Sequence, residues 1–451
     1  MIEKNENPAL SEALAASYSE AFHADRANEI AAAASVHDGF INAAADYQGL
    51  QKLPYSFSID LKQGSITNQK HSGRCWLFSA LNIFRYEVIH RYDLEDFELS
   101  QNYMFFYDKL ERCNYYLNNM IRLIDEPSDS RLFAFLSASP IGDGGQWDMM
   151  ANIVRKYGVV PKNVYPDGAN SLKSADFNQY LSTLLRQFTV DLRKAHQAGA
   201  SAKELQDIRR SQMKTVYRVL CIALGEPPKT FDVTLRSKDG TLNRDFGING
   251  KQFFHKYVGL NIDDYVSIIN APTADKPFGR TYTVKYLGNV CEGSPVKYLN
   301  LPIEKIKAAA ILQLKDGHPV WFGSDCMKYR LNTEGVFDPD SLPMDRFLNV
   351  PFTLTKGERL TYWDSAMDHA MVFLGVNLNG DDKPDRWRIE NSWGEESGLN
   401  KGYWIASDKW FNEYVYQIAI NKKYLSPEDQ ALLSQPVIEL EPWDPMGTLA
   451  D

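Results

Sequence analysis

A cysteine in the first fifth of the chain is placed where its thiol could act as a nucleophile. Cys75 opens a stretch in which apolar residues recur at three- and four-residue steps as far as Ile89, which is the period of a helix packing one face inward. Unpaired backbone N–H groups and the positive end of the helix dipole gather at a helix N-terminus, and both favour a thiolate over a thiol. The sequence therefore predicts a reactive thiol at residue 75. For a lone cysteine, a small buried apolar residue is the alternative.

A histidine and an asparagine far along the chain could complete an acyl-transfer centre. His369 and Asn391 lie on two strand-like segments, and the residues at 379–384 between them have strong turn chemistry. The mean of 369 and 391 is 380, inside that turn, so an antiparallel hairpin would make the two residues approximate cross-strand neighbours. The amide would then orient the imidazole, which can take the thiol proton and return it to a leaving amine.

Further elements must position these three residues. The pattern predicts a short strand within 51–67 before the cysteine, helices at 148–157 and 301–314, and strands at 281–284 and 319–322. From residue 171 to 224 it changes to long, charged helices.

The local sequences around these residues resemble those of the papain superfamily of cysteine peptidases. Gly73 and Trp76 flank the cysteine as in the papain signature. The segments Asp-His-Ala at 368–370 and Asn-Ser-Trp-Gly at 391–394 match the family's histidine and asparagine segments, in the family's order Cys, His, Asn. The resemblance implies an α+β fold of two lobes, one helical with the nucleophile and one β-barrel-like, with a large helical insertion.

The resemblance also implies roles for particular residues. The side chain of Gln69 and the backbone N–H of Cys75 would form the oxyanion hole, His369 would be the proton shuttle, and Asn391 would orient it. Trp393 would shield the histidine–asparagine contact from water. Trp76 would support the nucleophile segment.

A glycine pair before the predicted helix at 148–157 matches the family's substrate-binding loop. Gly144 and Gly145 expose backbone groups without a Cβ, so an extended peptide could hydrogen-bond along them. Without the resemblance, a tight turn that caps the helix explains the pair equally well.

Three departures from papain narrow the resemblance to the branch that contains bleomycin hydrolase and bacterial aminopeptidase C. Ser72 replaces a cysteine that forms a disulfide in secreted members. His369 follows Cys75 by 294 residues (369 minus 75), against about 130–150 in papain-like chains. The ending at 441–451 is like that of the branch.

That branch implies a homohexamer whose C-terminal arm lies in the non-primed side of the cleft. The carboxylate of Asp451 would meet the ammonium of peptide substrates with a free N-terminus. A disordered terminus is the alternative for this tail. The implied organisation is an N-terminal helical extension (1–48), a helical lobe (49–168), a helical insertion (169–255), a β lobe (256–440) and the arm (441–451).

Composition bounds the surroundings and the partners of the protein. Five widely separated cysteines without a Cys-x-x-Cys pair suggest neither a disulfide framework nor a zinc site. We expect no metal or organic cofactor. The N-terminus lacks a leader pattern and no run of about 18 apolar residues occurs, so we expect a cytoplasmic protein without membrane contact.

The charge pattern bears on nucleic acid as a partner. The net charge is −9, although residues 176–218 hold eight Lys or Arg against four Asp or Glu, a local balance of +4. We favour a solvated helix face or a subunit contact over nucleic-acid binding there, because no aromatic-interleaved or glycine-rich binding motif accompanies these charges.

The expected function is a thiol aminopeptidase, with bleomycin hydrolase-like amide hydrolysis included. Two alternatives remain. One is a papain-like endopeptidase whose tail is uninvolved, and the other is a nucleic-acid-binding protein with secondary peptidase activity.

Overall fold

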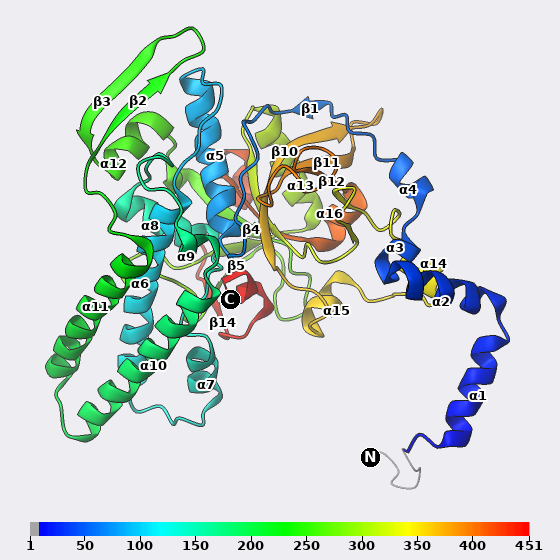
Figure 1. The fold of residues 1–451 in the computed structure, drawn as a ribbon, viewed down its shortest axis with the longest axis horizontal. Coiled ribbons are helices and arrows are strands. Elements are labelled where there is room, and N and C mark those ends of the chain that lie inside the picture. Colours follow the sequence, from blue (N-terminus) through cyan, green and yellow to red (C-terminus); the bar gives the residue numbers. More distant parts are fainter. Residues whose placement is uncertain (1–8, 451) are drawn as a thin grey trace. The chain divides into compact units, whose positions relative to one another are not determined.

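The computed structural model describes residues 9–450. The chain divides into two compact units, residues 1–54 with 338–353, and residues 55–337 with 354–451 (Figure 1). The boundary at 54 lies close to the expected end of the N-terminal extension at 48. The return of residues 338–353 to the first unit was not predicted from the sequence.

The smaller unit consists of short helices. Its helices are α1 (Glu12–His23), α2 (Arg26–Asp38), α3 (Phe40–Ala44), α4 (Tyr47–Gln51) and α14 (Met344–Leu348). No residue of α1 or α2 is buried. The contacts that join 338–353 to this unit are close. The N–H of Asp46 donates to the carbonyl of Ser341 at 2.9 Å, and the rings of Phe40 and Phe347 meet edge to face.

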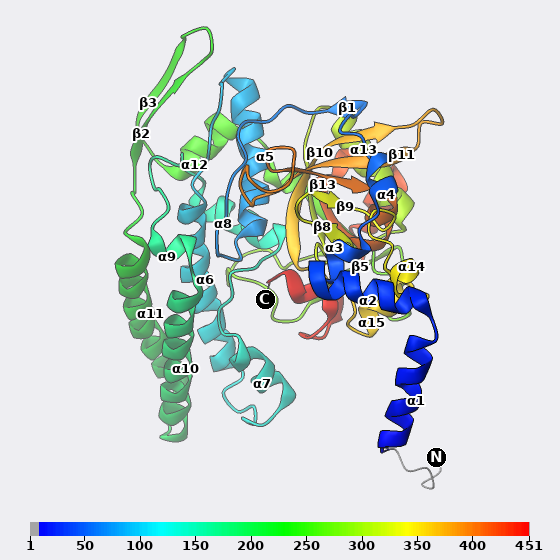
Figure 2. The same cartoon turned by 45° about the vertical axis from the view of Figure 1, so that its right-hand side comes forward.

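The helical part of the larger unit surrounds the cysteine helix. Its helices are α5 (Cys75–Arg91), α6 (Gln101–Arg122), α7 (Arg131–Ala138), α8 (Trp147–Tyr157), α9 (Ala169–Leu172), α10 (Ala175–Gln197), α11 (Ala202–Leu224) and α12 (Gly250–Phe253). The long helices α10 and α11 run side by side (Figures 1 and 2). The insertion is not wholly helical, because a hairpin of β2 (Phe231–Arg236) and β3 (Leu242–Ile248) follows α11.

A sheet forms the other part of the larger unit. Its strands are β1 (Ile59–Asp60), β4 (Tyr265–Ile269), β5 (Arg280–Val284), β6 (Tyr298–Asn300), β7 (Val320–Ser324), β8 (Arg330–Leu331), β9 (Val336–Phe337), β10 (His369–Leu378), β11 (Pro384–Glu390), β12 (Tyr403–Ser407), β13 (Val415–Asn421) and β14 (Ile438–Leu440). They are ordered β14-β5-β6-β4-β13-β7-β10-β11-β12-β9-β8, with β1 paired to β10. The predicted hairpin is therefore confirmed as β10–β11, and the predicted strands at 281–284 and 319–322 as β5 and β7.

The central strands are buried on both faces, which explains their continuous apolar runs. Along β10, Ala370 and Val372 pack into the core shared with α5, while Met371 and Phe373 pack into a second core on the opposite face. Helices α13 (Ile303–Lys315) and α16 (Asp408–Tyr414) contribute to that second core. The remaining helices of this unit are α15 (Lys356–Thr361) and α17 (Pro427–Leu432). This mixed architecture confirms the α+β class.

Helix α5 is buried around almost its whole circumference, and not on one face as its apolar spacing predicted. It packs against α6 and α8 on the helical side and against β10 and β7 on the sheet side. No helix among residues 9–450 is long and apolar enough to cross a membrane.

Candidate active site

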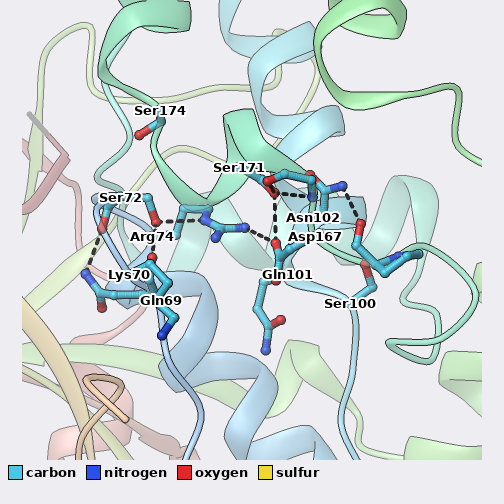
Figure 3. Close-up of polar contacts among 12 residues, drawn as sticks. Gln69, Lys70, Ser72, Arg74, Ser100, Gln101, Asn102, Asp167, Ser171 and Ser174 are labelled. Carbon is cyan, nitrogen blue, oxygen red and sulfur yellow. Dashed lines mark hydrogen bonds and ion pairs between the residues drawn. The ribbon is translucent and has the colours of Figure 1, made fainter. Parts of the chain in front are cut away.

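The loop before α5 is fixed by a buried arginine. Arg74 immediately precedes the helix, and its guanidinium donates to the hydroxyl of Ser72 at 2.9 Å and to the carboxylate of Asp167 at 2.8 Å (Figure 3). Its side chain is fully buried. The turn that ends at Cys75 is thus attached to the helical lobe, which fixes the position of the helix N-terminus.

The histidine and the asparagine meet directly. Nε2 of His369 lies 2.9 Å from Oδ1 of Asn391, and both side chains are buried. The same amide oxygen accepts the backbone N–H of Ser392 at 2.8 Å. Because this atom can only accept, Nε2 carries the imidazole proton in the neutral ring and Nδ1 is left as the base.

Trp393 covers the imidazole. Its ring stacks on that of His369 with centroids 4.8 Å apart and planes inclined by 26°. The guanidinium of Arg330 lies over the indole ring of Trp393, 5.4 Å from its centroid. One face of the imidazole is therefore covered by the indole ring.

The nucleophile helix is joined to the histidine strand next to both reactive groups. Ser79 donates its hydroxyl to the carbonyl of Ala370 at 2.7 Å. The backbone of Ala370 also lowers the pKa of Cys75, against the larger effect of burial. Helix α5 and strand β10 are therefore joined one turn after Cys75 and one residue after His369.

Burial opposes the charged forms of both reactive groups. Burial raises the pKa of the Cys75 thiol to about 12, against the stabilising backbone of Ala370 and Trp76. Burial also lowers the pKa of His369 to about 4, against the hydrogen bond that its ring donates to Asn391. The helix N-terminus does favour the thiolate, but desolvation is the larger effect. Burial therefore disfavours both the thiolate and the imidazolium.

The glutamine amide is held at both ends. Ser392 donates its hydroxyl to Oε1 of Gln69 at 2.6 Å, and Nε2 of Gln69 donates to the carbonyl of Ser72 at 2.7 Å. One amide hydrogen remains for another acceptor. Sequence reasoning missed Ser392, although its position directly after Asn391 was a usable signal.

The glycine pair packs tightly against the nucleophile segment. A Cβ on Gly145 would lie 2.5 Å from the ring of Trp76, and the indole N–H of Trp76 donates to the carbonyl of Asp143 at 2.6 Å. The carbonyl of Gly144 accepts from Arg112 at 2.6 Å. Both glycines are buried, so the close approach of the Trp76 ring gives residue 145 a packing reason to be glycine.

An aspartate that the sequence analysis did not single out organises this loop. The carboxylate of Asp143 accepts from Lys109 at 2.7 Å, from the amide of Asn178 at 2.6 Å and from the N–H of Gly73 at 3.2 Å. Although burial alone would raise it, Lys109 and these hydrogen bonds hold the pKa of Asp143 well below its ordinary value. Asp143 therefore joins the glycine loop to the segment before the nucleophile.

The described part of the C-terminal arm reaches the site. It ends in a 3₁₀ helix, Pro445–Ala450, in which Met446 and Leu449 are buried. Thr448 donates its hydroxyl to the carbonyl of Met367 at 2.8 Å, two residues before His369. Asp451, expected to bind the substrate ammonium, lies outside the described residues.

The basic helices of the insertion use part of their charge within the protein. The guanidinium of Arg186 donates to the carbonyls of residues 137 and 138, and that of Arg193 to the carbonyl of Leu123. These contacts attach α10 to the C-terminal end of α7 and to the residue that follows α6.

Comparison with known proteins gives concordant matches. The model of the Peptidase C1-like family matches residues 9–447. Aminopeptidase C of Streptococcus thermophilus is 44% identical over 417 residues, 92% of this chain and 94% of that protein. Aminopeptidase C of Listeria monocytogenes is 45% identical over 395 residues, 87% and 88% of the two chains. The crystal structure of pepw from Lactobacillus rhamnosis superposes with a TM-score of 0.95 at 44% identity, covering 98% of this chain and 99% of the other.

Proposed function

As a member of the Peptidase C1-like family, the chain is a cysteine aminopeptidase, and we propose that Cys75, His369 and Asn391 carry its acyl-transfer reaction on peptide substrates. The observation that carries this assignment is the buried hydrogen bond of 2.9 Å between His369 and Asn391. The strand β10, which begins at His369, is joined to the cysteine helix α5 by the hydroxyl of Ser79.

The reaction begins with transfer of the Cys75 thiol proton to the imidazole of His369, which remains as an imidazolium beside the thiolate. The sulfur of Cys75 attacks the carbonyl carbon, and the proton passes from Nδ1 of His369 to the leaving amine. Asn391 holds the ring throughout and stabilises the transient imidazolium. Water, deprotonated by the same imidazole, then hydrolyses the acyl-enzyme.

The negative oxygen of each tetrahedral intermediate is held by the remaining amide hydrogen of Gln69 and the backbone N–H of Cys75. One such donor contributes about 2.7–4 kcal/mol of transition-state stabilisation in acyl-transfer enzymes. The two hydrogen bonds that fix the Gln69 amide support this role, because a donor that is already oriented needs no reorganisation during the reaction.

Restriction to free N-termini comes from the arm at 441–451. An arm in the non-primed side of the cleft leaves space for little more than one residue before the scissile bond. The terminal carboxylate of Asp451 then meets the substrate ammonium, and opposite charges about 4 Å apart gain roughly 4 kcal/mol at an effective dielectric of 20, before desolvation. Backbone groups of Gly144 and Gly145 line the same side. The contact of Thr448 with Met367 supports this course of the arm.

We also infer that the protein works as a homohexamer in the cytoplasm, as its branch of the family implies. The exposed apolar side chains of Leu14, Tyr18 and Phe22, spaced four residues apart on α1, support a role of this helix in assembly. Sedimentation velocity of the full chain tests the assembly, and a monomer at assay concentration contradicts it.

The central experiment compares one fluorogenic peptide in its free and N-acetylated forms. We expect wild type to hydrolyse only the free form, and Cys75→Ala to hydrolyse neither. A chain lacking a few C-terminal residues should lose aminopeptidase activity and gain internal cleavage. Equal wild-type rates on both forms would exclude the role of the arm and leave the thiol mechanism intact.

A further inference from the structure

A buried ion pair holds the arm at the point where its terminal helix begins. The ammonium of Lys276 lies 2.8 Å from the carboxylate of Asp444, and the two side chains are only 3% and 9% exposed. The second oxygen of Asp444 accepts the N–H of Met446 at 2.9 Å. One carboxylate therefore both attaches the arm to the body of the protein and starts the turn that carries Pro445–Ala450.

The backbone of Lys276 is held in place by a buried side chain of the sheet. The carbonyl of Lys276 accepts from the amide of Asn300 at 2.6 Å, and Asn300 is fully buried on β6. The backbone of Lys276 is thus fixed to the central sheet. The exposed carboxylate of Asp275 is a second acceptor for the same ammonium at 2.8 Å.

The residues after the anchor are held by polar contacts with the body of the protein and by the burial of Met446 and Leu449. Thr448 reaches Met367, the hydroxyl of Tyr298 donates to the carbonyl of Met446 at 3.1 Å, and Arg112 donates to the carbonyl of Ala450 at 3.3 Å. Loss of the anchor would leave the position of Pro445–Ala450 to these contacts and to the packing of its buried side chains alone.

A buried ion pair is suited to setting position more than stability. Well-packed apolar residues would stabilise such a place as much or more, whereas a buried carboxylate such as that of Asp444 must keep a cationic partner at hydrogen-bond distance. We propose that Lys276 and Asp444 are positioning residues that set how far the arm reaches along the cleft, and that they thereby determine selectivity for free N-termini. This inference rests on the proposed function of the arm.

A second contact anchors the preceding residue from the helical side. The guanidinium of Arg131 lies 3.8 Å from the centroid of the Trp443 ring, and Phe135 meets the same ring edge to face. Both partners come from α7. The arm is therefore held between α7 and the sheet just before its terminal helix.

The test uses Lys276→Met and Asp444→Asn in the full chain, with the N-acetylated and free forms of the fluorogenic peptide. We expect the ratio of kcat/KM for the blocked form to that for the free form to rise about tenfold in each variant. Hydrogen exchange of the segment 441–450 should accelerate in parallel. A purely structural role would lower both activities together and leave the ratio unchanged.

The matched control is Asp429→Asn. This carboxylate is also buried and also pairs with a lysine, Lys305 at 2.6 Å, but it lies on α17 away from the arm. We expect Asp429→Asn to have the same ratio of kcat/KM for the blocked peptide to kcat/KM for the free peptide as wild type. A ratio that stays at the wild-type value in both Lys276→Met and Asp444→Asn overturns the proposal.

Two further measurements make the result interpretable if a variant fails to fold or if the proposed function is wrong. If the two anchor variants do not fold, Trp443→Leu replaces them, because its ring is partly exposed and its loss leaves no unpaired carboxylate. An unchanged ratio in Trp443→Leu overturns the proposal in that case. If wild type hydrolyses the blocked form as fast as the free form, the proposed role of the arm fails. The exchange measurement then still tests whether the ion pair anchors residues 441–450.

Discussion

The hydroxyl of Ser392 donates to the side-chain oxygen of Gln69 at 2.6 Å, across 323 positions of sequence. Ser392 directly follows Asn391, whose amide oxygen lies 2.9 Å from Nε2 of His369. One two-residue segment after β11 therefore contacts both His369 and Gln69, the proposed base and the proposed oxyanion donor.

We expect Ser392→Ala to lower kcat about tenfold with little change in KM, because the Gln69 amide loses the hydrogen bond that aims it. Gln69→Ala should cost about 10²–10³ in kcat. The double variant should be no slower than Gln69→Ala alone, since the serine acts only through the glutamine. Steady-state kinetics of the three variants form the cycle, and multiplicative losses would show that Ser392 acts independently.

The pH profile should report the buried histidine. The imidazole must be neutral to accept the thiol proton, and burial lowers the pKa of His369 from 6.5 to about 4. Activity is therefore present above that pKa and lost below it. We expect kcat/KM to fall as pH drops through about 4 and not near 6.5. An acid limb near the ordinary histidine value would contradict this shift.

The same shift makes stability depend on pH. Between pH 6.5 and about 4 the unfolded chain binds a proton that the folded histidine does not, so the free energy of unfolding decreases as pH falls. The full effect is about 3 kcal/mol. Urea unfolding of wild type and His369→Gln over this range measures it, because the variant lacks this contribution. Parallel curves for the two proteins would exclude it.

A buried ion pair joins the nucleophile helix to the strand that precedes Asn391. Arg85 on α5 lies 2.6 Å from Glu390 at the end of β11, and both side chains are essentially inaccessible. Burial raises the pKa of Glu390, against the attraction of Arg85. We expect Glu390→Gln to lower the free energy of unfolding by about 3 kcal/mol, because a buried guanidinium is left without its counter-charge.

The control for that prediction is an exposed pair. Asp207→Asn breaks the contact with Arg210, whose side chains are 53% and 69% exposed, and should have little effect on stability. Equal effects of Glu390→Gln and Asp207→Asn in urea unfolding would contradict the structural role assigned to the buried pair.

The glycine loop provides a steric test. A Cβ at residue 145 would lie 2.5 Å from the ring of Trp76, so Gly145→Ala should cost about 1–3 kcal/mol of stability through overpacking and should reduce kcat/KM. Gly168→Ala is the matched control, because no atom lies within 4 Å of its added Cβ. Thermal unfolding and kcat/KM of both variants test this prediction. Wild-type stability and activity in Gly145→Ala would show that the Trp76 ring can move aside.

Local patterns were enough to predict the elements that hold the catalytic residues. The apolar spacing after Cys75 predicted α5, and the turn chemistry at 379–384 predicted the β10–β11 hairpin. These signals are reliable because they depend on neighbours within a few residues of one another. The register was approximate. Val372 pairs with Glu390, so Asn391 lies diagonally across from His369, just past the end of the strand.

The resemblance of short motifs was enough to propose which residues form the site, but short motifs do not show how deeply each reactive group is buried. The helix N-terminus at Cys75 indicated a stabilised thiolate, whereas burial raises the thiol pKa to about 12. Desolvation depends on every segment packed around the sulfur, and those segments come from distant parts of the chain. No local window contains that information.

The sequence by itself determined the chemistry, because side-chain types at Cys75, His369 and Asn391 and their strand and helix contexts are properties of short segments. The tertiary structure alone decided the support of that chemistry, including Ser392 on Gln69, Asp143 beneath the glycine loop and Lys276 on Asp444. Each of these contacts joins positions more than 30 residues apart. Such pairs arise only when the lobes fold together, since spacing along the chain does not specify which distant polar groups share one buried place.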